Sequence, residues 1–205
     1  MITSFLKHRP NANKIKNEFG LPWLKLDINV PYKDILDEFK QIEHELILHR
    51  ANDNVLGQTH KGWKSLTLYG ADKHITEQTN DPYNWQSLNC PKTIKWIKEN
   101  FIISETTGRI RFMYIEPGGY ILPHHDRETK KLSEINVAIS NPQGCTFRFV
   151  ERGNIPFEDG TAFIIDTSNK HMVHNNTNKP RLHIILHTNI NDEIIERSYE
   201  KSYYN

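Results

Sequence analysis

Residues 109–187 read RIRFMYIEPGGYILPHHDRETKKLSEINVAISNPQGCTFRFVERGNIPFEDGTAFIIDTSNKHMVHNNTNKPRLHIILH. Short apolar runs alternate here with clusters of Gly, Pro, Asn and Asp. The runs that predict strands are Arg109–Ile115, Tyr120–Leu122, Glu134–Ile139, Thr146–Val150, Thr161–Ile165 and Leu182–His187. The turn clusters between them are Pro117–Gly119, Asn141–Gly144, Glu158–Gly160 and Asn175–Pro180. Short strands at such regular intervals are typical of an antiparallel sandwich or barrel.

The residues before this stretch mix helix and strand patterns. Trp23–Ile28 predicts a short strand, and from Pro31 onward the apolar residues Ile35, Leu36, Phe39, Ile42 and Leu46 have helical spacing. The run WKSLTLY between Gly62 and Gly70 predicts a strand, the polar stretch Ala71–Asn89 a long loop, and a second helix is expected from about Pro91. We therefore expect a mainly β protein with flanking helices, in which an α/β N-terminal part precedes the barrel.

The expected organisation is a single domain over residues 1–205. Residues 1–106 would pack on the barrel and shape the substrate side, and residues 107–190 would form the catalytic core. Residues 191–205 are expected to be a C-terminal tail or a short helix.

The composition describes an ordinary globular protein. Of 205 residues, 37% are hydrophobic and 25% charged, and 26 basic residues nearly balance 25 acidic ones, for a net charge of +1. This balance lacks the basic surface typical of proteins that bind nucleic acids or membrane surfaces, so we expect neither partner. No stretch approaches the ~20 apolar residues of a membrane helix, and the first residues lack the apolar core of a secretion signal.

The cysteine and histidine contents indicate the cellular environment and the type of functional site to expect. Two cysteines, Cys90 and Cys145, are too few for a disulfide framework, so we expect a reducing, cytoplasmic environment. The chain holds 11 histidines, several of them late in the sequence. Histidine is the residue type best suited to metal and proton chemistry near neutral pH. No pattern indicates an oligomeric state.

The sharpest local motif is Pro123-His124-His125-Asp126. On a strand, residues two apart point the same way, so His124 and Asp126 share a face and His125 points to the opposite one. An imidazole and a carboxylate in this arrangement can chelate one divalent ion. The same residues also fit an ordinary surface turn, so the motif alone does not decide between a metal site and a turn.

A third ligand is available downstream. The strand expected over Gly160–Asp166 leads to His171, 45 residues after Asp126. Two histidines and one carboxylate leave coordination positions open, as in non-haem Fe(II) oxygenases, whereas a structural zinc site needs four closed protein ligands. His174 competes with His171 for this third position.

The run from Arg181 to His187 has a polar face. Arg181, His183, Ile185 and His187 alternate with Leu182, Ile184 and Leu186. An arginine pointing into a barrel is costly unless it meets an anion, and a guanidinium pairs with a carboxylate through two parallel hydrogen bonds. The pattern indicates a dicarboxylate cosubstrate, and the alternative is an Arg181 at the barrel rim that pairs with an Asp or Glu.

These residues resemble a known family. The segments PGGYILPHHD (117–126), INVAISNPQGCTFRF (135–149) and DGTAFIIDTSNKHMVHNNTNKPRLHIIL (159–186) are similar to the aspartyl/asparaginyl β-hydroxylase-like Fe(II)/2-oxoglutarate dioxygenases. They are also similar to the bacterial cis-proline hydroxylases of that group. The resemblance covers about residues 109–187 and implies the double-stranded β-helix, or cupin-like jelly roll, of this superfamily.

The resemblance also implies roles for individual residues. By position, His124 and His171 would be the histidine ligands and Arg181 the clamp for 2-oxoglutarate, and the spacing to Arg181 favours His171 over His174. The animal peptide hydroxylase of the family lacks the carboxylate ligand, whereas this chain keeps Asp126. Asn136 stands on a strand where family members often place a polar residue near the 2-oxoglutarate carboxylates.

The implied activity uses Fe(II) as cofactor and 2-oxoglutarate and O2 as cosubstrates. It would hydroxylate an amino acid, either free or as an Asp, Asn or Pro residue of a peptide or protein, and release succinate and CO2. Candidate substrate contacts are His125, Arg127, Trp63 and Lys64, with residues 72–85 as a candidate lid; Trp63 also fits a core position. Two alternatives stay open, a cupin-type metal enzyme that does not use 2-oxoglutarate and an inactive jelly roll that binds a ligand.

Overall fold

The computed structural model describes residues 22–50, 54–55, 57–76, 79–126 and 134–204. The strands are β1 (Trp23–Lys25), β2 (Ile47–Leu48), β3 (Asn54–Val55), β4 (Gln58–Thr59), β5 (Lys61–Gly70), β6 (Asn84–Trp85), β7 (Ile110–His124), β8 (Glu134–Ser140), β9 (Cys145–Phe149), β10 (Gly153–Asn154), β11 (Ala162–Ile165), β12 (His171–Asn175) and β13 (Arg181–Leu186). The helices are α3 (Tyr32–Ile42), α4 (Pro91–Asn100) and α5 (Asp192–Tyr204), with a 3-10 turn, η1 (Glu43–Glu45), after α3.

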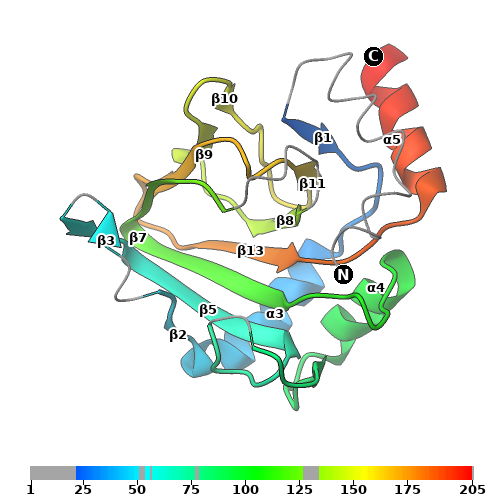
Figure 1. Ribbon diagram of the computed structural model, residues 1–205, viewed down its shortest axis with the longest axis horizontal. Helices are drawn as coiled ribbons and strands as arrows, with labels where there is room; N and C mark the ends of the chain where they lie inside the picture. The colour runs from blue at the N-terminus through cyan, green and yellow to red at the C-terminus, as the bar shows by residue number, and fades with distance from the viewer. Residues whose placement is uncertain (1–21, 51–53, 56, 77–78, 127–133, 205) are drawn as a thin grey trace.

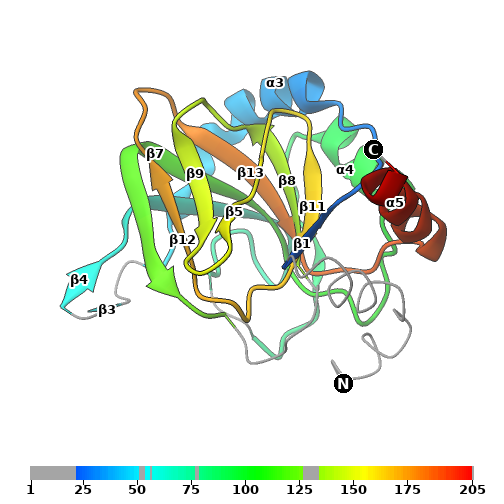
Figure 2. The ribbon, with the colours of Figure 1, turned by 90° about the horizontal axis from the view of Figure 1, so that it is seen from above.

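One antiparallel sheet curls round to form most of the molecule (Figures 1 and 2). Its strands follow the order β1-β11-β8-β13-β7-β12-β9-β10, and β5 adds to β7 and carries β2 and β6. The first half of β7 pairs with β13 and its second half with β12, and β5 pairs with β7 from Ile110 to Tyr120. The mainly β fold with flanking helices is therefore confirmed, and β1 and β5 of the N-terminal part join the same sheet as the later strands.

The alternation of side chains along the strands builds two apolar layers. Met113 and Ile115 of β7 belong to a cluster inside the curled sheet, together with Trp63 and Phe147. Phe112 and Tyr114, on the other face of β7, pack against Phe39 of α3 with ring centroids 5.0 and 6.0 Å away. The outer layer thus anchors the helices and leaves the inner face of the sheet to line a cavity.

The helices cover the outer face because each has one apolar side. Ile35, Phe39 and Ile42 of α3 are buried, and Figure 2 shows α3 and α4 together on one outer side of the sheet. The carboxylate of Glu38 in α3 accepts hydrogen bonds from the backbone N–H groups of Lys92 and Thr93, each 2.8 Å long. This buried carboxylate satisfies the first turn of α4, whose free N–H groups attract negative charge.

Several sequence expectations needed correction. Pro117–Gly119 is not a turn between two strands, because β7 continues through it, with Gly118 in the left-handed region at φ +67°. β12 was not among the predicted strands, and it pairs with both β7 and β9. The loop expected over residues 71–89 contains the two-residue strand β6. Of the two forms expected for the C-terminal residues, a tail or a short helix, the structure has the helix α5.

Two further observations concern the expected class. Both Cys90 and Cys145 are buried and free of a disulfide. Within the described ranges, no helix is both long enough and apolar enough to cross a membrane. The division into residues 1–106, 107–190 and 191–205 stays a prediction.

Candidate metal centre and cosubstrate pocket

The three residues predicted as metal ligands come together where β7 and β12 meet. His124, at the end of β7, pairs across the sheet with His171, at the start of β12, and their ring centroids are 4.4 Å apart. Asp126 follows two residues after His124, and one ligand atom from each of the three lies within 4.8 Å of the others. His124 Nε2 is 3.2 Å from Asp126 Oδ1, and His171 Nε2 is 3.5 Å from Asp126 Oδ2.

Backbone carbonyls orient both imidazoles. His124 Nδ1 lies 2.7 Å from the carbonyl oxygen of Leu122, and His171 Nδ1 lies 2.9 Å from that of Asn169. A carbonyl oxygen only accepts, so both Nδ1 atoms carry the proton and donate it. When the rings are neutral, as they are in a metal ligand, both Nε2 atoms then carry a lone pair on the Asp126 side. This arrangement, in which the second ring nitrogen is held by a backbone carbonyl, is usual for metal-binding histidines.

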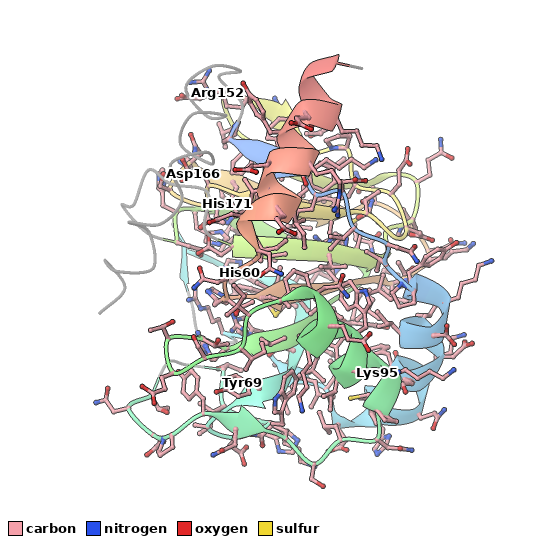
Figure 3. All side chains as sticks on the ribbon, turned by 90° about the vertical axis from the view of Figure 1, so that its right-hand side faces the viewer. His60, Tyr69, Lys95, Arg152, Asp166 and His171 are labelled. Carbon is pink, nitrogen blue, oxygen red and sulfur yellow. The ribbon has the colours of Figure 1, made fainter. Side chains whose placement is uncertain are left out.

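The turn before β12 fixes the position of His171. The buried carboxylate of Asp166 accepts hydrogen bonds from the backbone N–H and the hydroxyl of Ser168, at 3.1 and 2.6 Å, which closes an Asx turn. The ring of Phe147 stacks on His171 with centroids 5.3 Å apart and an angle of 8°. Figure 3 labels Asp166 and His171 close together on one side of the barrel.

The charges in this cluster depend on one another. Burial by itself raises the pKa of Asp126, but His124 and His171 beside it hold that pKa well below its usual range. For His124, burial lowers the pKa, and the Asp126 carboxylate more than offsets this, so that the pKa of His124 is raised. The carboxylate is therefore ionised near neutral pH, as a metal ligand must be.

The three residues line a cavity of about 320 Å³ inside the curled sheet. Its lining includes the apolar side chains of Met113, Ile121, Phe147, Ile165, Val173 and Ile185. Arg181 and Asn136 also line it. The volume is near the lower end of the range for small-molecule sites, ~300–1,000 Å³. The cavity therefore combines the ligand cluster with the residues predicted to bind a dicarboxylate.

Arg181 is a buried cation in a polar network. It is 2% exposed, and its Nη2 lies 2.8 Å from Nδ1 of His183. His183 Nε2 lies 3.1 Å from Oδ1 of Asn141, whose Nδ2 donates to the carbonyl oxygen of Phe157. Since Asn141 presents its oxygen, Nε2 of His183 is the protonated nitrogen and Nδ1 accepts from Arg181.

Asn136 completes this network. Its side chain is 1% exposed, and its Oδ1 lies 2.6 Å from His183 Nδ1. Because Nδ1 of His183 accepts from the guanidinium, it requires a donor from Asn136 as well. Turning the Asn136 amide by 180° about χ2 would place its Nδ2–H donor where Oδ1 lies. Burial, with the nearby Arg181 charge, lowers the pKa of His183 well below its ordinary value, so the imidazole is neutral.

The donor set and the buried arginine fit the groups that the sequence predicts. Two neutral imidazole nitrogens and one carboxylate form a facial set with open positions, which suits Fe(II). Within the described part of the chain, Arg181 Nε has no hydrogen-bond partner, and burial lowers the pKa of Arg181 to about 10. A guanidinium buried without a carboxylate is destabilising unless an anion binds. A dicarboxylate with one end at Arg181 therefore fits this pocket.

The remaining predicted residues lie as follows. Trp63 is buried, lines the cavity and has its ring centroid 6.3 Å from that of His124. Lys64, the next residue on β5, forms a 2.5 Å ion pair with Glu116 and does not line the cavity. His125 is exposed, and its Nδ1 lies 2.9 Å from the carbonyl oxygen of Ser168. Arg127 lies outside the described residues. His174 packs edge-on against Tyr120 and is not part of the ligand cluster.

Sequence reasoning missed several residues of the pocket. His183 and Asn141 hold Arg181, and His49, Arg50, Arg109, Arg111 and His187 line the cavity as well. His60 packs edge-on against His124, with ring centroids 5.9 Å apart, and is labelled in Figure 3 on the same side as His171. The alternation Arg109-x-Arg111 on a predicted strand was the signal available for two of them, since it places both side chains on one face.

Comparison with known proteins agrees with this geometry. The model of the family Aspartyl/Asparaginyl beta-hydroxylase matches residues 30–189. No curated protein sequence matches the chain significantly.

Solved structures share the fold at low sequence identity. A prolyl-4-hydroxylase from Pseudomonas putida has a TM-score of 0.53 and 13% identity, covering 88% of this chain and 99% of that one. A Trichoplax adhaerens prolyl hydroxylase, in complex with a hypoxia inducible factor peptide fragment, has a TM-score of 0.53 and 13% identity over 97% of each chain. A 2OG-Fe(II) oxygenase family oxidoreductase from Burkholderia pseudomallei has a TM-score of 0.52 and 10% identity, covering 88% and 91%.

The family match covers well over half of the chain, and the fold is that of the 2OG-Fe(II) oxygenases. The ligand cluster has the composition that such enzymes require. This chain belongs to the aspartyl/asparaginyl β-hydroxylase family of Fe(II)- and 2-oxoglutarate-dependent oxygenases, with His124, Asp126 and His171 as its candidate iron site.

Proposed function

We propose that this protein hydroxylates an amino acid, either free or as an Asp, Asn or Pro residue of a peptide, with consumption of 2-oxoglutarate and O2. The observation that carries the proposal is the position of Arg181. Its guanidinium is buried, its Nε has no partner among the described residues, and it lines the same cavity as the His-Asp-His cluster. A buried cation without a counter-ion is destabilising, so its presence beside a metal site supports an anionic cosubstrate that binds there.

The residues of the cavity would bind the iron and the cosubstrate and line the space around them. Asp126 and the Nε2 atoms of His124 and His171 would hold Fe(II), while Arg181 would bind the distal carboxylate of 2-oxoglutarate through paired hydrogen bonds. Apolar side chains line the same cavity beside these residues. When bound, the iron and its cosubstrate supply oxidative decarboxylation of 2-oxoglutarate to succinate and CO2, coupled to hydroxylation of a C–H bond.

The family and the fold both bear on the substrate class. The family's name supports an amino-acid residue as the substrate. The two prolyl hydroxylases share the fold with this chain at 13% identity, so proline belongs among the compounds to test. The cavity of about 320 Å³ has room for a cosubstrate and a small group, either a free amino acid or one side chain of a peptide.

Succinate formation tests the proposal most directly. Purified protein is given Fe(II), 2-oxoglutarate, ascorbate and air without further substrate, and the expected result is slow succinate release that is lost in His124→Ala. In Arg181→Gln, we expect the 2-oxoglutarate requirement to rise at least about tenfold while metal content is unchanged. His174→Ala is the matched control, because His174 is a histidine of the same strand outside the cluster.

Two outcomes would contradict parts of the proposal. If no succinate forms and 2-oxoglutarate does not bind to the anaerobic metal-loaded protein, the cupin-type alternative without 2-oxoglutarate takes its place. If His171→Ala retains full metal binding while His174→Ala loses it, the choice of third ligand is wrong.

A further inference from the structure

His60 is a histidine beside the candidate metal centre that the proposed function does not use. It lies between β4 and β5, is partly buried, and is not one of the three clustered ligands. Its ring meets that of His124 edge-on, with centroids 5.9 Å apart and an angle of 64° between the planes. A residue in this position can act on the metal only through the ligand beside it, so the contacts between the two histidines decide its role.

A single residue, Leu122, forms hydrogen bonds with both histidines. Its backbone N–H donates to Nδ1 of His60 at 3.0 Å, and its carbonyl oxygen accepts from Nδ1 of His124 at 2.7 Å. The N–H precedes the Cα atom of Leu122 and the carbonyl follows it, so one histidine is bonded to each side of this residue. Leu122 therefore connects the ring of His60 to the ring of a candidate metal ligand.

The strand β7 is irregular at this point. Between its pairings with Val173 and His171 of β12, β7 has two residues, Leu122 and Pro123, where β12 has one. Such a bulge interrupts the ladder of hydrogen bonds and redirects the side chains next to it. Pro123 has no N–H group with which to restore the ladder. The side-chain acceptor for the Leu122 N–H is thus placed where strand pairing fixes the backbone least, directly before His124.

The position of His60 is itself fixed. Its ring packs edge-on against Trp63, with centroids 4.9 Å apart and an angle of 87°. The next residue, Lys61, is the first of β5 and pairs with Tyr120 of β7, two residues before Leu122. Both the ring and the backbone of His60 are therefore held next to the bulge, so this residue can hold Leu122 in place.

We propose that His60 is a positioning residue for the metal centre: by accepting the Leu122 N–H, it directs the Leu122 carbonyl oxygen at Nδ1 of His124 and so turns Nε2 of that ligand toward the metal. The inference rests on the proposed function, in which His124 binds the metal. Groups that hold the second nitrogen of a histidine ligand typically contribute ~10–100-fold to metal affinity. Because His60 acts one residue further away, we expect the lower end of this range.

Two variants of similar shape separate the hydrogen bond from the packing. His60→Asn carries Oδ1 where histidine carries Nδ1, one bond beyond Cγ, and so keeps an acceptor for the Leu122 N–H. His60→Leu has the same branched shape and no acceptor. Both variants remove the rest of the ring, and with it the packing on Trp63 and every contact made by Nε2, so the acceptor is the main difference between them.

Equilibrium dialysis of the full chain measures the affinity for Mn(II), and the visible absorption of the Co(II)-loaded protein reports the geometry of the ligands. In His60→Leu, we expect the Kd for Mn(II) to rise about tenfold and the Co(II) bands to change. In His60→Asn, both should return toward the values of the original protein. Urea unfolding confirms that each variant is folded in the dialysis buffer, and His60→Ala, which also lacks the acceptor, replaces His60→Leu if the latter does not fold.

His174→Leu is the matched control. His174 is also partly buried and packs edge-on against an aromatic ring, that of Tyr120, but it lies outside the ligand cluster. The control should leave the Mn(II) affinity and the Co(II) bands unchanged.

Three results would overturn the inference: Mn(II) affinity and Co(II) bands in His60→Leu equal to those of the original protein, equal losses in His60→Asn and His60→Leu, or the same loss in His174→Leu. The second result would show that the ring of His60 only fills space. Failure of the unaltered protein to bind Mn(II) overturns the metal site of the proposed function instead, and this outcome is distinct from a failure confined to the His60 variants.

Discussion

Arg181 Nη2 lies 2.8 Å from Nδ1 of His183, two residues further along β13, and both side chains are buried. The two residues share the inner face of the strand. Since Asn141 accepts from Nε2 of the same ring, the imidazole is fixed as an acceptor toward the guanidinium. His183 therefore holds the orientation of Arg181 without adding charge, which leaves the whole positive charge available for an anion.

His183→Gln should weaken 2-oxoglutarate binding. The guanidinium loses the acceptor that orients it, and the cost of a lost buried hydrogen bond, ~1–3 kcal/mol, corresponds to a rise in Kd of about 5- to 150-fold. Calorimetric titration of 2-oxoglutarate into the Mn(II)-loaded protein measures this. Mn(II) affinity should stay unchanged, because His183 is not in the ligand cluster.

His174→Gln serves as the control, and it should bind 2-oxoglutarate normally. Because a glutamine at position 183 could also loosen the core, Asn141→Ala gives a milder test that removes only the partner of Nε2. If both His183→Gln and Asn141→Ala bind 2-oxoglutarate as the original chain does, the positioning role of His183 is refuted.

Asp126→Asn should lower metal affinity by at least about tenfold. The amide lacks the negative charge, and hard divalent cations bind carboxylate oxygen much better than amide oxygen at such sites. Equilibrium dialysis with Mn(II) measures the affinity, and Asp37→Asn on the exposed side of α3 is the control. An unchanged Mn(II) affinity in Asp126→Asn would remove Asp126 from the ligand set.

Local patterns predicted the parts of the site that lie on single strands. The spacing of His124 and Asp126 placed both on one face, and the alternation from Arg181 to His187 placed the arginine inside the sheet, where it is 2% exposed. Both are consequences of the two-residue period of a strand. The fold class followed from the regular spacing of the strands and turns.

Parts of the site that depend on long-range pairing were not predictable in this way. Arg50 reaches the cavity because β2 pairs with β5, and β5 pairs with β7, a chain of contacts that no local period encodes. β12 was overlooked because His171, His174 and Asn175 make its sequence resemble a turn, and only pairing on both sides makes it a strand. Tertiary pairing outweighs local preference at such positions.

Acid should destabilise the metal-free protein through His49. This side chain is 3% exposed, and its pKa is lowered from 6.5 to about 2, first by burial and then by Arg111, Arg50 and Arg109. Below about pH 6.5 the unfolded chain takes up a proton that the folded one does not, so the free energy of unfolding falls as pH falls. The slope is about 1.4 kcal/mol per pH unit between roughly pH 6.5 and 4.5.

Urea unfolding at several pH values measures this slope, and His49→Gln, which cannot titrate, should reduce it by about that amount. His183 acts in the same direction, and its contribution remains in the variant. The lowered pKa of Asp126 makes the free energy of unfolding depend on pH only below about pH 4. The raised pKa of His124 makes it depend on pH only above about pH 6.5, so neither group affects the slope measured between these values. Equal slopes in the variant and the original chain would show that His49 is not buried in its neutral form.

The adjacent glycines of β7 should respond differently to substitution. A Cβ on Gly119 would lie 2.8 Å from the carbonyl oxygen of Lys61 and 2.9 Å from that of Glu116, and neither backbone atom can move cheaply. At Gly118, with φ +67°, nothing lies within 4 Å of such a Cβ, so only the left-handed backbone restricts the residue. Asn tolerates that conformation better than other side chains.

Gly119→Ala should therefore lower the free energy of unfolding by about 1–3 kcal/mol, and Gly118→Asn by less than about 1 kcal/mol, measured by urea unfolding. Around these glycines, β7 passes from its pairing with β13, which ends at Ile115, to its pairing with β12, which begins at Tyr120 and aligns His124 with His171, while β5 pairs with β7 on both sides of them. A forced separation at Gly119 should then also weaken Mn(II) binding, which Gly118→Asn should preserve. Equal losses of stability and metal affinity in the two variants would mean that the alignment of the two histidines does not depend on the close approach of β5 and β7 at Gly119.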